Sequence, residues 1–292
     1  KYTKEEHWYQ LVISALSINL AILLIGNNLI HLLAIFAVAV IYFIRNKDWK
    51  IIAFILSCVF LMSAEKSVIT NYYEVKSQKE IAEGVPKITW IAMGMQEGER
   101  EAGWWNRFNY DIMPEEEYDE KRITEISKTS MKQRLNVFRD NPKYAFDFYQ
   151  RKYENQFIEP TFQSLLVTAP QRNFSNETTL EKIRDFFVKQ IYFNHTHTVL
   201  EFIMKVFQVF VYLFTFVFAV VMYKRKNEFF AIIPIAFIGG TLFNMIWEAK
   251  SRYIFPYFVF LIPLSAYGLV IVRNKIKEYK KLKEEKDEKS TI

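Results

Sequence analysis

The chain has 292 residues, of which 51% are hydrophobic and 17% aromatic, with 27 Phe and 17 Tyr against 8 Gly. The charged content of 24% resembles that of a soluble protein, but the charges are segregated into dense polar stretches between long uncharged runs. This pattern is typical of a polytopic membrane protein with one sizeable hydrophilic domain. The net charge of +6 does not indicate nucleic-acid binding, because much of the basic excess lies in short loops and the tail. The single cysteine, Cys58, excludes an intrachain disulfide.

Hydrophobic stretches at both ends of the chain are long enough, or nearly so, to cross a hydrocarbon core of about 30 Å. In chain order they are Trp8–Ile25, Leu29–Ile44, Ile51–Ala64, Val199–Tyr223, Phe229–Trp247 and Tyr253–Val272. We expect the third stretch to continue to Ile69. The sequence therefore predicts a polytopic α-helical membrane protein with about six transmembrane helices.

Basic residues gather in three regions that six spans would place on one side of the membrane. These regions are the loop 45–50, the loop 224–226 and the Lys-rich tail 273–292. The positive-inside rule makes that side cytoplasmic. We therefore expect a plasma-membrane protein with both ends of this chain in the cytoplasm.

The predicted organisation has four parts. Residues 1–70 hold transmembrane helices 1–3, residues 71–198 form one mostly helical extracytoplasmic domain, and residues 199–272 hold helices 4–6. Residues 273–292 form a basic cytoplasmic tail.

The first half of the outer domain shows two contrasting patterns. Gly84 and Pro86, followed by the run Lys87–Met95, predict a turn and then a strand or buried extended segment. A helix is predicted from about Asp119 to Arg139. Its apolar side is expected to consist of Ile123, Ile126, Met131, Leu135 and Phe138.

Two further helices are predicted by their start signals. Asn141-Pro142 is typical of a cap and a first-turn proline, and we expect that helix to end at Pro160. The spacing from Thr178 to Glu181 indicates a capping box for a third helix. Because the fourth span follows closely, we expect this amphipathic helix to lie on the outer membrane surface.

The short stretch between the fifth and sixth spans places charged residues between two apolar helices. We expect a tight corner at the outer water boundary, where ions keep most of their hydration and can contact a lipid headgroup. Arg252 has a planar fork of donors suited to phosphate, and Lys250, Glu248 and Tyr253 lie beside it. The corner is therefore our candidate phosphate-binding site.

Charges at two other span ends have a simpler interpretation. Glu65 precedes Lys66, and Glu201 lies one helical turn before Lys205. Ordinary boundary charge is favoured over a functional role for both pairs.

Two polar groups in the outer segment are weaker candidates for chemistry. Glu97, Glu99 and Glu101 alternate in a glycine-flanked loop, and a solvated acidic loop is favoured over a base or a metal ligand. His195 and His197 could bind a metal, but two ligands without a nearby carboxylate favour an interfacial polar stretch. We therefore predict no metal-binding residues, although a divalent metal stays possible as a cofactor.

Three stretches together resemble a known enzyme class. The run 86–95, followed by Gly103-Trp104-Trp105-Asn106, looks like the outer loop of Gram-positive membrane glycosyltransferases of the GT-C class. The stretch 159–164 resembles a later part of that loop. The stretch 248–253, with Pro256, resembles a motif that opens a late helix in protein-mannosyltransferase-like and aminoarabinose-transferase-like enzymes.

The resemblance implies an enzyme that transfers a sugar from a polyprenyl-phosphate donor to a cell-wall or envelope glycopolymer. Arg252 and Lys250 would stabilise the developing charge on the donor phosphate. Trp90, Trp104 and Trp105 would stack on sugar faces. Membrane lipids are the other expected partners, and nucleic acid is not one.

The chain departs from the GT-C pattern in one respect. Those enzymes carry a key acidic residue in their first outer loop, whereas the first outer turn here is Gly26-Asn27-Asn28. We therefore expect the chain to be the C-terminal portion of such an enzyme, with the catalytic base upstream of residue 1. Two alternatives stay open: a non-catalytic membrane subunit for envelope polymer assembly or transport, and a lipid-linked polysaccharide polymerase.

Overall fold

The computed structural model describes residues 8–81, 84–115, 119–165, 178–224 and 228–290. In these ranges the secondary structure is helical and no strand occurs. The chain divides into two compact units. The N-terminal unit comprises residues 1–87 and 227–239, and the C-terminal unit comprises residues 88–226 and 240–292. The boundary between the two units falls within one helix, between Gly239 and Gly240.

Apolar helices of membrane-spanning length are present in both units. Among the described residues, five helices are long and apolar enough to cross a membrane. They cover Gly26–Asn46, Trp49–Ser77, His195–Tyr223, Phe229–Ile246 and Ser251–Lys286. The first predicted span is a shorter apolar helix, Tyr9–Leu24. The third extends well beyond Ile69, to Ser77.

The N-terminal unit is built from apolar helices. It contains α2 (Trp8–Leu24), η1 (Gly26–Asn28), α3 (Leu29–Asn46), α4 (Trp49–Ser77), η2 (Glu228–Ala231) and the first part of α12 (Ile232–Ile246). Ala15, Leu32 and Cys58 are buried where the first three apolar helices meet. Neighbouring residues end α3 and start α4. Lys47 adopts a left-handed backbone conformation at the end of α3, and the Asp48 carboxylate caps α4 by accepting a hydrogen bond from the Lys50 backbone N–H at 3.1 Å.

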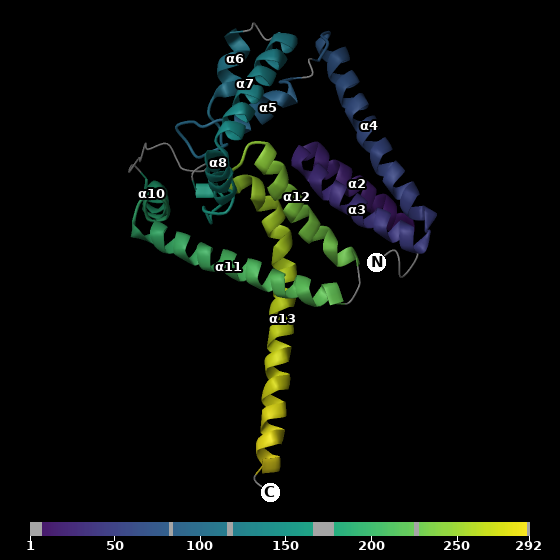
Figure 1. Cartoon of the computed structure of the whole chain (residues 1–292), viewed down its shortest axis with the longest axis vertical. Helices are drawn as coiled ribbons and strands as arrows, with labels where there is room; N and C mark the ends of the chain where they lie inside the picture. Colours follow the sequence, from purple (N-terminus) through teal and green to yellow (C-terminus); the bar gives the residue numbers. More distant parts are fainter. Residues whose placement is uncertain (1–7, 82–83, 116–118, 166–177, 225–227, 291–292) are drawn as a thin grey trace. The chain divides into compact units, whose positions relative to one another are not determined.

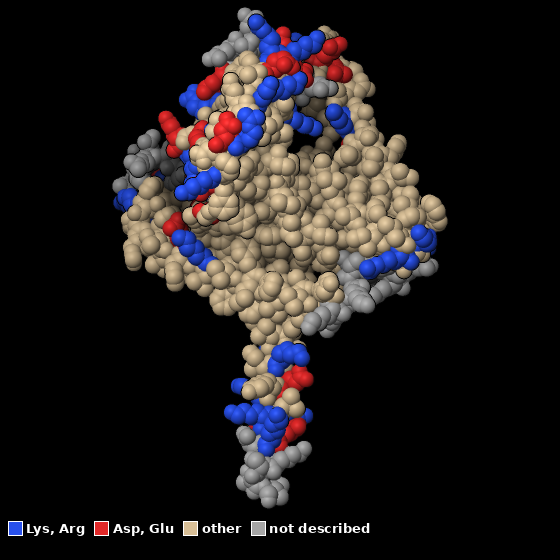
Figure 2. All heavy atoms as spheres, in the orientation of Figure 1, with Lys and Arg blue, Asp and Glu red and all other residues tan. Residues whose placement is uncertain are grey.

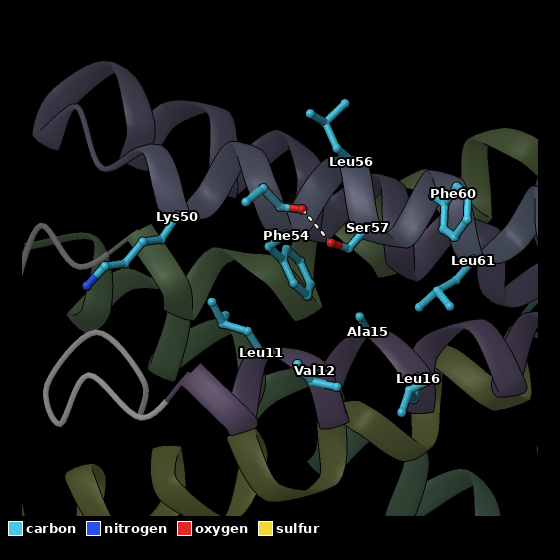
Figure 3. A pocket seen from close by; sticks show the side chains of 11 residues that line it. Leu11, Val12, Ala15, Leu16, Lys50, Phe54, Leu56, Ser57, Phe60 and Leu61 are labelled. Carbon is cyan, nitrogen blue, oxygen red and sulfur yellow. Dashed lines mark hydrogen bonds between the residues drawn. The ribbon is translucent and has the colours of Figure 1, made fainter.

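A groove of about 840 Å³ lies between α2 and α4 in this unit (Figure 3). It is lined by Leu11, Val12, Ala15, Leu16, Lys50, Ala53, Phe54, Leu56, Ser57, Phe60 and Leu61. Lys50 is the charged member of this set, and the Ser57 hydroxyl donates to the Ala53 carbonyl of its own helix at 2.7 Å. The groove therefore offers an apolar wall of the kind that lipid tails cover, with few groups that could do chemistry.

Three helices of the C-terminal unit carry its apolar surface. They are α11 (His195–Lys224), the second part of α12 and α13 (Ser251–Ser290). The helices α11 and α13 pack together so closely at Gly268 that any side chain there would overlap the Phe214 carbonyl, and glycine permits this approach. A helix of the length of α13 spans about 60 Å, roughly twice a hydrocarbon core. Its second half carries densely packed basic and acidic side chains, whereas its first half and α11 present mostly uncharged surface (Figure 2).

The remaining helices of this unit follow several predicted signals. They are α5 (Lys87–Gly94), α6 (Phe108–Glu115), α7 (Glu120–Asp140), α8 (Pro142–Glu154) and α10 (Thr179–Tyr192). The caps at Asp119, Asn141 and Thr178 are all present, and the last forms a complete capping box with Glu181. The helix α8 ends at Glu154, before the predicted stop at Pro160.

Two predictions about this region were wrong. The segment 87–94 is a helix, not a strand, and it buries Thr89, Ala92, Met93 and Gly94. A short apolar run has the same hydrophobic pattern in a buried helix as in a buried strand, so packing decides between them. Leu135, predicted on the apolar side of α7, is 54% exposed because that side turns away at this point.

An aromatic core holds α7 and α8 together beside the loop after α5. Phe148 is fully buried, and Phe138 lies 5.2 Å from it, ring centre to ring centre. The Arg134 guanidinium lies over the Phe138 ring and donates to the Met95 carbonyl at 2.8 Å. This contact ties the start of the 95–107 loop to α7.

Candidate functional site

The predicted corner is the turn between α12 and α13, and it is buried. Glu248 is 5% exposed, Lys250 is 4% exposed, and Ala249 and Ser251 are fully buried. The expectation that these charges lie at an open water boundary was therefore wrong for Glu248 and Lys250. The helices α5 and α8 and the residues that follow each of them cover the turn and supply partners for its buried charges.

Backbone contacts dock the corner against α5 and the loop after it. A side chain at Gly94 would overlap the Trp247 carbonyl oxygen, so this close approach requires glycine. The Ala249 N–H donates to the Gly103 carbonyl at 2.9 Å. Gly103 itself has a φ of +69° and lies against the Lys152 side chain.

Polar residues of α8 complete the docking. The Lys152 ammonium donates to the Gly94 carbonyl at 2.5 Å and to the Trp247 carbonyl at 2.6 Å. These two carbonyls end α5 and α12, so one side chain satisfies acceptors at two helix C-termini. Asn155 donates to the Ala249 carbonyl at 2.9 Å. The corner's geometry is therefore set by α8.

The buried Lys250 ammonium contacts a carboxylate, an amide oxygen and an aromatic ring. Its ammonium is 2.5 Å from the Glu101 carboxylate and 3.1 Å from the Asn155 side-chain oxygen. It also lies 4.1 Å from the centre of the Trp104 ring. Burial alone would raise the pKa of Glu101, but the hydrogen bond and charge of Lys250 hold it below its usual value.

The acidic loop was predicted to be solvated, and its residues 97–101 are exposed, although two of its carboxylates are also paired. Glu101 pairs with Lys250, as described above. Glu97 accepts from the Arg151 guanidinium at 2.6 Å and from the Tyr144 hydroxyl at 2.8 Å. These pairs tie the exposed loop between α5 and α6 to α8 and to the corner.

Glu248, Tyr253 and Arg252 form a chain of polar contacts. The Tyr253 hydroxyl and the Trp105 backbone N–H both act to lower the pKa of the Glu248 carboxyl, and one of its oxygens has no hydrogen-bond partner among the described residues. The Arg252 guanidinium donates to the Tyr253 oxygen at 2.6 Å. Burial raises the pKa of Glu248, against the opposing effects of Tyr253, Arg252 and Lys152. Arg252 is exposed, so it is the corner's accessible cation.

The loop after α8 places a second carboxylate beside the corner. The Glu159 carboxylate accepts from the Thr161 N–H at 2.8 Å and the Ser251 hydroxyl at 3.3 Å, and also from the Gln163 N–H. Phe162 and Gln163 are left-handed, with φ values of 53° and 59°. The Glu159 contacts hold this strained turn in place.

A cavity of about 440 Å³ opens among these groups, and we call it the Lys250 cavity. It is lined by Glu101, Trp104, Glu159, Thr161, Gln163, Leu165, Tyr192, Phe193, His197, Glu201 and Lys250. Gln163 is 2% exposed, and its side-chain oxygen has no hydrogen-bond partner among the described residues. A cavity with an unpaired buried acceptor and several charged walls suits a polar ligand.

The three candidate tryptophans have different surroundings. Trp104 lines the Lys250 cavity, and its ring lies 4.5 Å from the Arg100 guanidinium. Trp105 also stacks with Arg100, at 4.8 Å. Trp90 is stacked on Trp247 with 6.4 Å between ring centres. Trp104 is therefore the tryptophan that the fold brings to the cavity.

Several site residues were not predicted, and one signal could have identified part of this set. Lys152 lies one turn after Phe148 on α8, and it is buried together with Asn155 and Gln156 in the turn that directly follows the helix. Polar residues on the buried stripe of an aromatic-rich helix require partners, which indicates a polar site. Among the described residues, no group of three or more metal-ligating side chains is placed to hold an ion.

The fold and the corner define a class: a polytopic helical membrane protein with a polar site at the junction of two apolar helices. Over residues 2–269 the chain matches the family described as conserved hypothetical integral membrane protein, and it belongs to that family. No curated protein and no solved structure matches it. The site's chemistry therefore has to be argued from its own residues.

Proposed function

We propose that the protein is a membrane glycosyltransferase that moves a sugar from a polyprenyl-phosphate donor to a cell-envelope glycopolymer. The reaction takes place on the outer face of the plasma membrane, with the loops 45–50 and 224–226 and the tail in the cytoplasm. The segregated basic residues support this orientation. The resemblance of the corner and the outer loops to GT-C enzymes supports the reaction.

The Lys250 cavity is the observation that carries the proposal. Its 440 Å³ suits a single sugar, whose hydroxyl groups need hydrogen-bond partners and whose apolar face stacks on an aromatic ring. The cavity supplies carboxylates, an amide, an ammonium and the Trp104 indole. His197 and Glu201 line the cavity from the start of α11, and Lys250 lines it from the position directly before α13; both helices are apolar and of membrane-spanning length. A lipid-anchored headgroup can therefore reach the cavity without leaving the membrane surface.

Arg252 is assigned to the donor phosphate. Lys250 is already neutralised by Glu101, so it serves better as a wall of the cavity than as a phosphate ligand. The Arg252 guanidinium has five N–H groups, and the hydrogen bond to Tyr253 leaves donors for phosphate oxygens. As the sugar departs, the phosphate gains negative charge, which Arg252 stabilises.

The cavity's charge favours an uncharged or cationic sugar. Three carboxylates, those of Glu101, Glu159 and Glu201, line it together with one ammonium, that of Lys250. A uronic acid would add another negative charge to this wall and would be repelled. A neutral hexose or an amino sugar is the expected donor headgroup.

The test uses purified protein in liposomes with donors labelled in the sugar. The donors are polyprenyl-phosphate glucose, galactose, mannose and N-acetylglucosamine, and the acceptor is cell-wall polymer extracted from the source cells. We expect the wild type to move label from one donor into the polymer, and Arg252→Ala to reduce the rate by about 10²–10³-fold. Arg252→Lys should keep part of the activity, because lysine retains charge but loses the planar fork.

The matched control is Arg139→Ala, since Arg139 is an exposed cation on α7, paired with its neighbour Asp140. This variant should transfer sugar at the wild-type rate. A wild type that consumes none of the four donors would contradict the proposal and favour a non-catalytic role. Full activity in Arg252→Ala would remove Arg252 from the site.

A further inference from the structure

The Lys250 cavity contains a histidine–glutamate pair that has no part in holding the corner. His197 and Glu201 lie one turn apart at the start of α11, and both line the cavity. We infer that His197 accepts the proton of the acceptor hydroxyl during sugar transfer, with Glu201 as its positioning residue. This inference rests on the proposed function, and it gives a base within the described residues.

The orientation of the His197 ring follows from one hydrogen bond. Nδ1 of His197 lies 2.9 Å from the Ile191 carbonyl oxygen. A carbonyl can only accept, so Nδ1 carries the hydrogen and Nε2 of the neutral ring keeps its lone pair. The contact thus fixes both the tautomer and the ring position, as a base in a transfer enzyme requires.

Glu201 lies on the basic side of the ring. Its carboxylate oxygen is 3.6 Å from Nε2 of His197, which is too long for a hydrogen bond but close enough for charge to act. When Nε2 takes a proton, the imidazolium gains an ion pair with Glu201. The carboxylate therefore stabilises the charge that forms during the reaction. Side chains of both residues are about one-third exposed, at 32% and 34%, so an acceptor can reach them.

The other carboxylates of the cavity are occupied as hydrogen-bond acceptors. Glu101 is held by the Lys250 ammonium, and Glu159 accepts from two backbone N–H groups and two hydroxyls. These donors occupy the carboxylate oxygens of Glu101 and Glu159. Among the described residues no donor lies on Nε2 of His197, so that lone pair is available to an incoming hydroxyl.

The step balances without any further reagent. The acceptor O–H bond breaks, and its proton goes to Nε2 of His197. The acceptor oxygen forms a bond to the anomeric carbon of the donor sugar. The bond between that carbon and the phosphate oxygen breaks, and its electron pair leaves with polyprenyl phosphate, next to Arg252. His197 then releases its proton to water.

The test compares two histidines two residues apart. His197→Gln should lower kcat by about 10²–10⁴-fold with little change in KM for the donor. His195→Gln is the control, because His195 is exposed and does not line the cavity. His197→Ala should recover activity when imidazole is added, and this rescue distinguishes a lost base from a damaged fold.

The role of Glu201 as a positioning residue is tested by comparing kcat of single and double variants. Glu201→Gln alone should lower kcat by about tenfold, whereas adding it to His197→Gln should cause no further loss. Independent losses in the double variant would contradict the pairing.

The outcomes separate this inference from the proposed function. If the wild type transfers sugar and His197→Gln is fully active, His197 is not the base but the transferase stands. If His197→Ala is inactive and imidazole does not restore it, the inference is also overturned. If the wild type itself transfers no sugar, the proposed function fails first.

Discussion

The ammonium of Lys250 lies 2.5 Å from the carboxylate of Glu101, across a separation of 149 residues in the chain. The two side chains differ in burial: that of Lys250 is 5% exposed and that of Glu101 is 47% exposed. Because water can solvate only one partner well, removing Glu101 and removing Lys250 should have unequal effects on stability.

Glu101→Gln should destabilise the protein by about 1–3 kcal/mol, because it leaves the buried Lys250 charge with weaker partners. Lys250→Met should cost less, since a half-exposed carboxylate can hydrate. The double variant should be more stable than Glu101→Gln alone. Thermal unfolding of the detergent-solubilised variants measures all three effects, and additive losses would contradict the pairing.

The same pair gives wild-type stability an acid dependence. The folded pKa of Glu101 lies below the ordinary value of 4.5, so its contribution is present above that pH. This contribution is lost as the pH falls through the lower folded pKa. Glu101→Gln should lose less stability than the wild type over that acidic range.

Lys152 should give the protein a second pH signature, in the alkaline range. Burial lowers its pKa from 10.5 to about 7, while the charge of Glu248 opposes the shift. Between these values the unfolded chain binds a proton that the folded protein lacks, so stability should rise with pH from about 7 to 10. The neutral amine still has two hydrogens for the two carbonyls that it joins.

Lys152→Met should abolish that rise and lower stability by about 2–4 kcal/mol, because it leaves the Gly94 and Trp247 carbonyls unpaired. Denaturant unfolding at pH 7 and pH 9.5 measures both quantities. An equal pH slope in the two proteins would contradict the assignment.

Gly94 and Gly26 differ in the space around them, so Gly26 is a control for replacement of Gly94 by alanine. A side chain at Gly94 would overlap the Trp247 carbonyl, whereas nothing lies within 4 Å of a side chain at Gly26. Gly94→Ala should therefore separate α5 from the corner and destabilise the protein by about 1–3 kcal/mol. Gly26→Ala should leave the melting temperature unchanged or slightly higher. Equal melting temperatures for both variants would argue against the docking.

Trp104 and Trp90 should respond differently to replacement by leucine. Trp104 lines the cavity, and its indole N–H has no hydrogen-bond partner among the described residues. Trp104→Leu should raise KM for the sugar donor by about three- to tenfold. Trp90 stacks on Trp247, so Trp90→Leu should lower the melting temperature without changing KM. The reverse pattern would move the sugar site to Trp90.

Local signals in the sequence predicted much of the helical architecture. The predicted caps at Asn141 and Thr178 involve residues within three positions of one another, and both were confirmed, as was the helix predicted from about Asp119. The segment 87–94 was predicted wrongly, because its helical state depends on distant packing partners rather than on its own pattern.

The candidate site was predictable only in part, for a related reason. The corner was identified from its charges, but the partners of Lys250 lie 149 and 95 residues away. Only the fold brings Glu101 and Asn155 to it, so burial of the corner could not be anticipated. His197 and Glu201 were interpreted as ordinary boundary residues because nothing local connects them to the corner.

The proposed function requires the corner to lie outside the cell, and this placement can be measured directly. Cys58 is buried and is the chain's single cysteine, so Cys58→Ala provides a background for new labelling sites. In that background, Lys143→Cys on α8 and Lys280→Cys on the second half of α13 report on the two sides. Whole cells are treated with a membrane-impermeant maleimide. We predict that position 143 is labelled at once and position 280 only after permeabilisation; labelling of position 280 from outside, or protection of position 143, would contradict the proposed site.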